Sequence, residues 1–264
     1  MKTGVSTACF FGREQIEDSF DVLRRMGVDV TEVFLNTFSE YEKDFAEQLA
    51  ARRGGIGVHS VHAHGTCFEP ELFSSHDRIR EDAEEIFKKV CAAGFMLGAK
   101  YYTFHGPFLK VDRPLNLDYL RFSARLNQLC EIASRYGIKI AYENVCWAYG
   151  NNLEFFKTLL PLCPELKTTL DVKQAIYSGI DPLKVLDVMG SRVATVHICD
   201  MDAKNHPCLP GKGRYPFAKF FKTLAADYPD MTVLIEVYKD CYGGYDELAE
   251  NYRYVSDLVK NTIK

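Results

Sequence analysis

The 264-residue chain lacks the cysteine pattern of a disulfide-stabilised protein. Its nine cysteines are odd in number and scattered, and no two of them form a C-x-x-C pair. Small secreted proteins use evenly numbered, closely spaced cysteines, so this pattern indicates reduced thiols. The residues after Met1 also lack the charged and apolar segments of a signal peptide. We therefore expect a cytoplasmic protein.

Long runs of one kind of residue are also missing. No stretch is rich in Lys or Arg, and the net charge of the chain is −4. Because nucleic-acid and membrane-surface binding draw on clustered positive charge, the composition supports neither partner. No apolar segment approaches the roughly 20 residues that a membrane-spanning helix needs. We expect a small-molecule partner rather than a nucleic acid or a membrane.

Segments that would divide the chain into domains are absent as well. No Pro- or Ser-rich linker interrupts the sequence, so we predict a single domain over residues 1–264. Hydrophobic residues make up 47% of the chain, which is enough to build a large core. The length is usual for a single α/β barrel.

Short apolar runs rich in β-forming residues alternate with longer segments of helical spacing. One run, residues 140–145, follows a helical segment at residues 117–137, as a buried parallel strand does. The predicted strands cover residues 4–10, 30–38, 56–64, 101–105, 140–145, 166–171, 193–197 and 232–236. Eight strand–helix units predict an α/β fold that closes into a (β/α)8 TIM barrel, with a last helix over residues 245–264. An open doubly wound sheet is the competing fold, but no G-x-G-x-x-G follows the first strand.

Polar side chains stand at the ends of four successive predicted strands. They are Glu143, Asp171, His197 and Glu236. In a barrel the carboxyl ends of all strands meet at the functional face, and a buried carboxylate there needs a partner. A single acid at a strand end is often a helix cap or a salt-bridge partner, but four in succession favour a metal site. Such oxygen and nitrogen ligands suit Mn²⁺, Mg²⁺, Co²⁺ or Zn²⁺ and leave positions for substrate oxygens.

Further residues face the same predicted rim and are candidates for substrate binding. His62 and His105 lie near the ends of the third and fourth strands. Gln174 lies three residues after Asp171, where its amide can bond a hydroxyl group, and His206 lies in the loop after the seventh strand. For any one of these histidines alone, a satisfied surface or core imidazole is the simpler interpretation.

Two features of the loops leave alternatives open. Trp147, the only tryptophan, follows the fifth strand and offers a face on which a sugar ring can pack, although anchoring of the loop explains it equally well. Lys212 and Arg214, beside Gly211 and Gly213, offer charge and backbone N–H groups to a phosphate. A solvated loop with two ordinary basic residues is the slightly favoured interpretation.

The order of these motifs resembles the xylose isomerase-like TIM-barrel superfamily over essentially the whole chain. The motifs are His62 in Val-His-Ala-His, His105 in Phe-His-Gly-Pro, Glu143 in Tyr-Glu-Asn, Asp171 in Leu-Asp-Val-Lys-Gln, His197 in Val-His-Ile-Cys-Asp, His206 ahead of Pro-Gly-Lys-Gly, and Glu236 in Ile-Glu-Val. Members of the superfamily include sugar and sugar phosphate isomerases and epimerases, inosose-type dehydratases and isomerases, and endonuclease IV of AP endonuclease family 2.

The resemblance implies one divalent metal ion, with Mn²⁺ the first expectation, held by Glu143, Asp171, His197 and Glu236. It implies an isomerase or epimerase that acts on a ketose or related sugar, with or without a phosphate. Glu143 and Glu236 would then transfer protons through an enediolate. The substrate-binding candidates are His62, His105, Gln174, His206 and Trp147, and a homo-oligomer is left open.

Two other functions stay open at this point. An endonuclease IV-like phosphodiesterase holds three zinc ions, and His62, His105 and His206 match three of its further ligands. However, the resemblance leads us to expect a histidine where this chain has Gln174 and an aspartate where it has Lys204. A cation at a ligand position opposes additional metals, so these departures favour the single-metal branch. The other alternative is a barrel that binds a sugar without turning it over.

Overall fold

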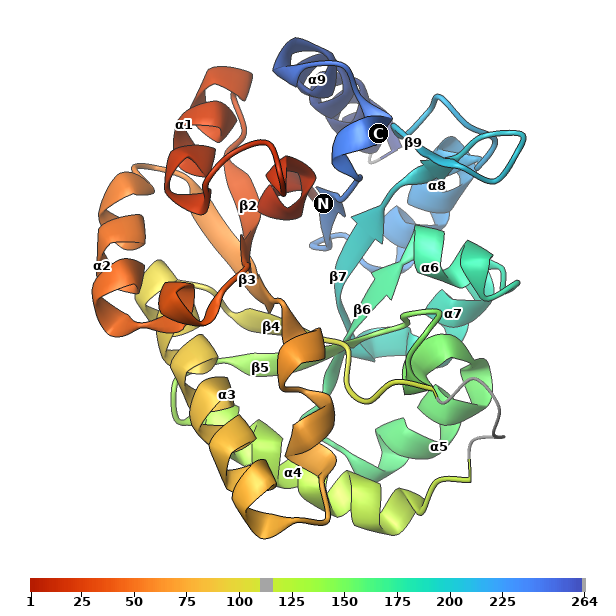
Figure 1. Cartoon of the computed structure of the whole chain (residues 1–264). Coiled ribbons are helices and arrows are strands. Elements are labelled where there is room, and N and C mark those ends of the chain that lie inside the picture. The colour runs from red at the N-terminus through yellow and green to blue at the C-terminus, as the bar shows by residue number, and fades with distance from the viewer. Residues whose placement is uncertain (110–115, 263–264) are drawn as a thin grey trace.

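A closed barrel of parallel strands forms the centre of the protein (Figure 1). The structure is a computed structural model that describes residues 1–109 and 116–262. Within these residues, eight strands pair in the order β1-β10-β7-β6-β5-β4-β3-β2. Their bounds are β1 (Lys2–Ser6), β2 (Val30–Leu35), β3 (Gly57–Ala63), β4 (Tyr101–Phe104), β5 (Lys139–Glu143), β6 (Lys167–Asp171), β7 (Val193–Ile198) and β10 (Thr232–Ile235). The predicted single-domain (β/α)8 barrel is confirmed.

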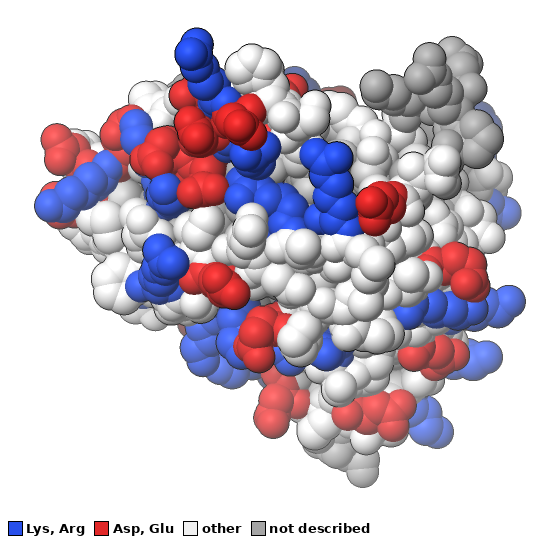
Figure 2. Space-filling model, turned by 90° about the horizontal axis from the view of Figure 1, so that it is seen from below, with Lys and Arg blue, Asp and Glu red and all other residues white. Residues whose placement is uncertain are grey.

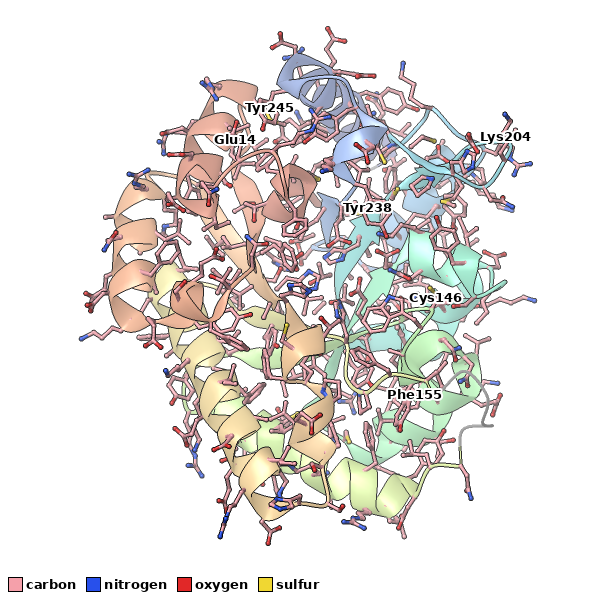
Figure 3. The ribbon with its side chains drawn as sticks, viewed as in Figure 1. Glu14, Cys146, Phe155, Lys204, Tyr238 and Tyr245 are labelled. Atoms are coloured by element: carbon pink, nitrogen blue, oxygen red, sulfur yellow. The ribbon has the colours of Figure 1, made fainter. Side chains whose placement is uncertain are left out.

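Helices surround the barrel on the outside (Figure 1). They are α1 (Ile16–Met26), α2 (Lys43–Arg52), α3 (Asp77–Leu97), α4 (Tyr119–Ser134), α5 (Leu153–Leu162), α7 (Pro182–Met189), α8 (Phe217–Asp227) and α9 (Tyr245–Thr262). The last two residues of the predicted final helix, 263–264, lie outside the described residues. Tyr245 links the start of α9 to the segment before α1, because its hydroxyl donates to Glu14 at 3.0 Å (Figure 3).

Helix α1 shows how the sequence pattern produces these elements. Ile16, Phe20, Leu23 and Met26 repeat at helical spacing, and all four are buried. Gly27 ends the helix in the left-handed conformation, with φ at +75°, which a glycine adopts without steric cost.

The structure differs from the predicted elements at several strand ends. The first strand stops at Ser6 because the Ser6 side chain accepts a hydrogen bond from the Ala8 N–H and caps a 3₁₀ helix, Thr7–Phe10. The short helix α6 (Val172–Tyr177), absent from the prediction, follows β6 directly because Asp171 caps it by accepting from the Gln174 N–H at 2.6 Å. The spacing of hydrophobic residues in the sequence does not predict such side-chain caps.

The predicted loop after the seventh strand contains a small antiparallel pair, β8 (Asp200–Met201) and β9 (Pro207–Cys208). We call residues 200–215 the β8–β9 loop. The buried Asp200 carboxylate lies at the base of this loop and holds it in place. It accepts the backbone N–H groups of Gly211, Gly213 and Tyr215, each at 3.0 Å. These N–H groups are therefore already bonded, and the phosphate cradle considered above loses its backbone donors.

Side chains alternate along each strand between the barrel interior and the surrounding helices. Val33 and Leu35 of β2 are fully buried in the hydrophobic core. Glu32, the residue before Val33, points to the other side of the strand and contacts the hydroxyl groups of Ser60 and Thr103 on β3 and β4. The barrel interior thus contains a buried polar layer, and the residues two positions further along several strands form the functional rim.

Surface charge and hydropathy agree with the composition. Acidic and basic side chains lie interspersed over the face shown in Figure 2. Among residues 1–109 and 116–262, no helix has both the length and the apolar character that crossing a bilayer requires.

Gly106, two residues after the end of β4, provides a test of the rim's packing. Its φ is +74°, and an added Cβ would collide with the hydroxyl oxygen of buried Tyr142. We expect Gly106→Ala to lower the free energy of unfolding by about 2–4 kcal/mol, from backbone strain and overpacking together. Urea denaturation would measure this. Gly55→Ala is the control, because its Cβ would meet no atom within 4 Å and its φ is not positive; equal losses in both variants would contradict the packing argument.

Candidate metal centre and active site

The four polar strand ends predicted from the sequence converge at one point in the structure. Glu143 and Asp171 are the last residues of β5 and β6, His197 lies near the end of β7, and Glu236 follows β10. One ligand atom from each lies within 4.8 Å of the others, and all four residues are buried. The convergence follows from parallel strands whose carboxyl ends share one rim of a closed barrel.

The geometry of this cluster fits a divalent metal ion. His197 Nδ1 lies 3.0 Å from Glu143 Oε1 and 3.4 Å from Glu236 Oε2. Asp171 Oδ1 caps α6, while its other oxygen, Oδ2, is buried and accepts no hydrogen bond from the residues that the structure describes. A buried carboxylate oxygen without a hydrogen bond is costly, and a metal cation would satisfy it. Three carboxylates and one imidazole are a donor set for Mn²⁺, Mg²⁺, Co²⁺ or Zn²⁺.

Burial and neighbouring charged groups shift the pKa values of the three acids in different directions. Burial raises the pKa of Asp171 to about 7, which Glu143 and Glu236 reinforce and Lys173 opposes. Burial also opposes ionisation of Glu143, but hydrogen bonds with His105 and His197 outweigh it and lower the pKa of Glu143 to about 2. Burial is likewise outweighed at Glu236, where His197 holds the pKa well below its usual range. Both glutamates are therefore ionised at neutral pH.

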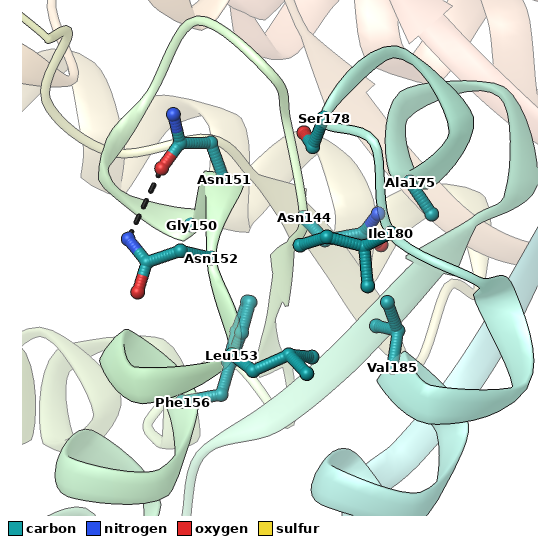
Figure 4. Close-up of a pocket in the computed structure, with 10 residues that line it drawn as sticks. All are labelled: Asn144, Gly150, Asn151, Asn152, Leu153, Phe156, Ala175, Ser178, Ile180 and Val185. Atoms are coloured by element: carbon teal, nitrogen blue, oxygen red, sulfur yellow. Dashed lines mark hydrogen bonds between the residues drawn. The ribbon is translucent and has the colours of Figure 1, made fainter.

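Asn144 fixes the relative position of two of the proposed ligands. Its Nδ2 donates to the Asp171 carbonyl oxygen at 2.9 Å, and its Oδ1 accepts from the Asp171 N–H at 2.7 Å. This reciprocal pair ties the end of β5 to the end of β6. Asn144 also lines a small pocket between the loop after β5 and the residues around α6 and α7 (Figure 4).

His62 and His105 reach the same cluster, as the sequence predicts. The two imidazoles contact each other through Nε2 at 2.9 Å, and His105 Nε2 lies 3.0 Å from Glu143 Oε2. His62 Nδ1 lies 3.5 Å from Glu236 Oε1. The two histidines therefore border both glutamates.

Trp147 and Gln174 lie around this core. The indole of Trp147 is 38% exposed, and it meets the rings of His105 and Phe108 edge-on with centroids 5.2 Å apart in each case. An exposed aromatic ring thus stands beside a cluster imidazole. Gln174 uses its Oε1 to accept the Cys146 N–H at 3.2 Å, so it holds the loop after β5.

The structure does not bring His206 to the cluster. Its side chain is 69% exposed and pairs with Asp202 at 3.4 Å in the β8–β9 loop. Lys204, in the same loop, lies at the periphery of the molecule in Figure 3, away from the barrel centre. The loop turns outward because Asp202 also accepts the N–H groups of Lys204 and His206, at 2.7 Å and 2.8 Å.

A buried lysine that the sequence interpretation missed stands beside two of the proposed ligands. Lys173 is 3% exposed, and its Nζ lies 3.9 Å from both Asp171 Oδ2 and Glu236 Oε2. The ammonium group lies 4.5 Å from the ring centroid of Tyr238, which Figure 3 shows over the barrel. Burial alone would lower the pKa of Lys173, but the two carboxylates raise it well above its usual range. Its position follows from α6, which hydrophobic spacing did not reveal.

Two buried glutamates were also missed. Glu32 lies inside the barrel at 0% exposure, in a strand whose sequence does not show which face turns inward. Glu69 accepts the N–H groups of His105 and Gly106 at 2.8 Å each and the hydroxyl of Tyr102 at 2.6 Å. Glu69 therefore positions the backbone that carries His105.

The sequence profile described as xylose isomerase-like TIM barrel matches residues 20–261. The chain belongs to this family. The resemblance inferred from the motifs is thereby confirmed, and the xylose isomerase-like barrel extends over nearly the whole chain.

Solved structures of similar fold include several sugar epimerases. A D-tagatose 3-epimerase-like protein has a TM-score of 0.81 at 18% identity, with 99% of this chain and 98% of that chain covered. D-psicose 3-epimerase from Clostridium cellulolyticum H10 has a TM-score of 0.80 at 15% identity, with both chains fully covered. An IOLI protein with a bound zinc atom has a TM-score of 0.81 at 18% identity, with 99% of each chain covered. No curated protein sequence matches this xylose isomerase-like chain significantly. At these identities the likeness concerns the fold.

Proposed function

We propose that the protein is a metal-dependent isomerase or epimerase of a ketose or related sugar. The observation that carries the proposal is the pair of buried glutamates, Glu143 and Glu236, within one ligand cluster with Asp171 and His197. Epimerisation beside a carbonyl uses one such group to remove a proton and a second, on the opposite face of the substrate, to deliver one. The epimerase names among proteins of the same fold support the choice of a sugar.

In the proposed reaction the two glutamates move protons. When bound, the metal would polarise the sugar carbonyl and stabilise the enediolate charge. One glutamate, ionised at neutral pH, removes the carbon-bound proton, and the other delivers a proton that it has first taken from a substrate hydroxyl group or from solvent. Delivery to the opposite face of the same carbon is epimerisation, whereas delivery to the neighbouring carbon is isomerisation. His62, His105 and the exposed ring of Trp147 would orient the sugar, and Gln174 would support the loop that carries Trp147.

We expect one metal ion per chain after loading with Mn²⁺. Glu143, Asp171, His197 and Glu236 supply one compact ligand set, in which Asp171 Oδ2 has no hydrogen-bond partner among residues 1–109 and 116–262. Elemental analysis after dialysis should give about one equivalent, and Mg²⁺, Co²⁺ or Zn²⁺ should compete for the same site. Three tightly held zinc ions would contradict this assignment.

The activity itself is tested with a panel of ketoses and ketose phosphates in the presence of Mn²⁺. Turnover of one sugar should yield its epimer or isomer, and deuterium from the solvent should appear at the reacting carbon. Failure of the metal-loaded protein to convert or exchange any sugar it binds would favour the non-catalytic barrel.

A second candidate is an endonuclease IV-like phosphodiesterase. One observation favours it: His62, His105 and Glu143 form a second group whose ligand atoms lie within 4.8 Å of one another. The outward position of His206 and Lys204 leaves this group without the loop ligands expected of a three-zinc centre. Cleavage of a duplex that contains an abasic site, with zinc present, would revive this candidate.

A further inference from the structure

We propose that Glu32 is a positioning residue that determines which ring nitrogen of His197 faces the metal centre. The inference rests on the proposed metal-dependent function. It assigns a role to a residue inside the barrel that belongs to neither the predicted ligands nor the substrate contacts.

Glu32 is held rigidly below the cluster by three hydroxyl groups from three other strands. Its Oε2 accepts from Ser60 at 2.8 Å and from Thr103 at 2.6 Å, and its Oε1 accepts from Ser6 at 3.1 Å. The residue is 0% exposed. A buried carboxylate that costs this much to desolvate, and is bonded this completely, has a fixed place and orientation.

Two imidazoles of the cluster face this carboxylate. His197 Nε2 lies 3.2 Å and His62 Nδ1 lies 3.6 Å from the same oxygen, Oε1 of Glu32. Among the described residues His197 Nε2 has no regular hydrogen-bond partner, and Glu32 Oε1 is the charged atom that it faces. His62 Nδ1, in contrast, also lies 3.5 Å from Glu236 Oε1. An ionised carboxylate accepts hydrogen bonds but donates none, so we assign the hydrogen of the His197 ring to Nε2.

The opposite nitrogen of the His197 ring is thereby directed toward the functional rim. This is Nδ1, which faces Glu143 Oε1 at 3.0 Å and Glu236 Oε2 at 3.4 Å and is the nitrogen that would bind the metal. An anion behind a ligating imidazole fixes its tautomer and raises its basicity, and loss of such a partner typically lowers metal affinity about 10- to 100-fold.

The test compares wild type, Glu32→Gln and Asp200→Asn in titrations of the full chain with Zn²⁺ at one fixed pH. The amide in Glu32→Gln keeps the volume and still accepts from hydroxyls, but it removes the negative charge. We expect calorimetry to show metal affinity about 10- to 100-fold weaker. Asp200→Asn is the matched control, because Asp200 is also a fully buried carboxylate with several donors but lies outside the ligand groups, and its affinity should equal that of wild type.

A second measurement does not depend on any variant folding. In the zinc-loaded wild type, long-range ¹H–¹⁵N spectra of labelled histidine should show the His197 proton on Nε2 and the metal on Nδ1. A proton on Nδ1, or an unchanged affinity in folded Glu32→Gln, would overturn the inference. Absence of zinc binding in wild type would instead overturn the proposed metal centre, so the two failures are distinguishable.

Discussion

In an epimerase, replacing Glu143 or Glu236 by glutamine is expected to lower turnover at least about 100-fold, the low end for loss of a general acid or base. Glutamine keeps an oxygen that can contact the metal but cannot transfer a proton. The metal should remain bound, with reduced affinity, and substrate should still bind. Steady-state kinetics with a confirmed sugar, together with metal analysis of each variant, would measure the effect.

The two glutamine variants need not behave alike. In an epimerase each direction uses a different glutamate as the base, so exchange of the carbon-bound proton with deuterated solvent can survive in one variant. In an isomerase one glutamate can shuttle the proton, and the variant of the other glutamate would keep much of its activity.

Glu165→Gln is the control, because Glu165 is 74% exposed and pairs only with surface Lys139 among the described residues. Metal-replete variants that both work at the wild-type rate would transfer the acid–base role to His62 or His105.

Replacing Lys173 by methionine is expected to lower the free energy of unfolding of the metal-free protein by about 3–5 kcal/mol, the usual loss when one partner of a buried ion pair is removed. The ammonium group is 3.9 Å from both Asp171 Oδ2 and Glu236 Oε2, and all three side chains are largely buried. Without it, the two carboxylates lose the ammonium group that they share. Urea denaturation of metal-stripped protein would measure the loss.

Metal should reverse part of this loss. Mn²⁺ replaces the missing positive charge beside Asp171 and Glu236, so saturating metal should restore stability, and the metal affinity of Lys173→Met should exceed that of wild type. Lys157→Met is the matched control: its partner Glu154 is closer, at 2.6 Å, but both side chains are at least half exposed. Such a surface pair contributes only about 0–1 kcal/mol. Similar losses in both lysine variants would show that Lys173 is not coupled to the acidic cluster.

The sequence predicted the barrel and the core of the candidate site because both depend on regular repetition. Strand–helix alternation defines a parallel sheet, and Glu143, Asp171, His197 and Glu236 occupy equivalent positions at its strand ends. Their convergence then follows from closure of the barrel, without knowledge of any single contact.

The residues that escaped prediction depend on local geometry instead. Lys173 lies in α6, which begins where the Asp171 side chain caps a backbone N–H. The spacing of apolar residues in the sequence does not predict such a cap. Glu32 is visible as a charge within β2, but period-two alternation does not distinguish the inward face from the helix-covered face when both are buried. His206 was placed at the rim from its position after β7, and the hydrogen bonds to Asp202 turn it outward.

The two aspartates of the β8–β9 loop divide it into separately anchored halves. Asp200 fixes the base through buried bonds to backbone groups, and Asp202 folds the exposed tip through bonds to its own neighbours. Because both anchors bind main-chain N–H groups, they place no constraint on the side chains at positions 203 and 204. The tip is therefore an exchangeable module at these two positions: they can be diversified, by selection or by design, while the barrel and its ligand cluster keep their shape.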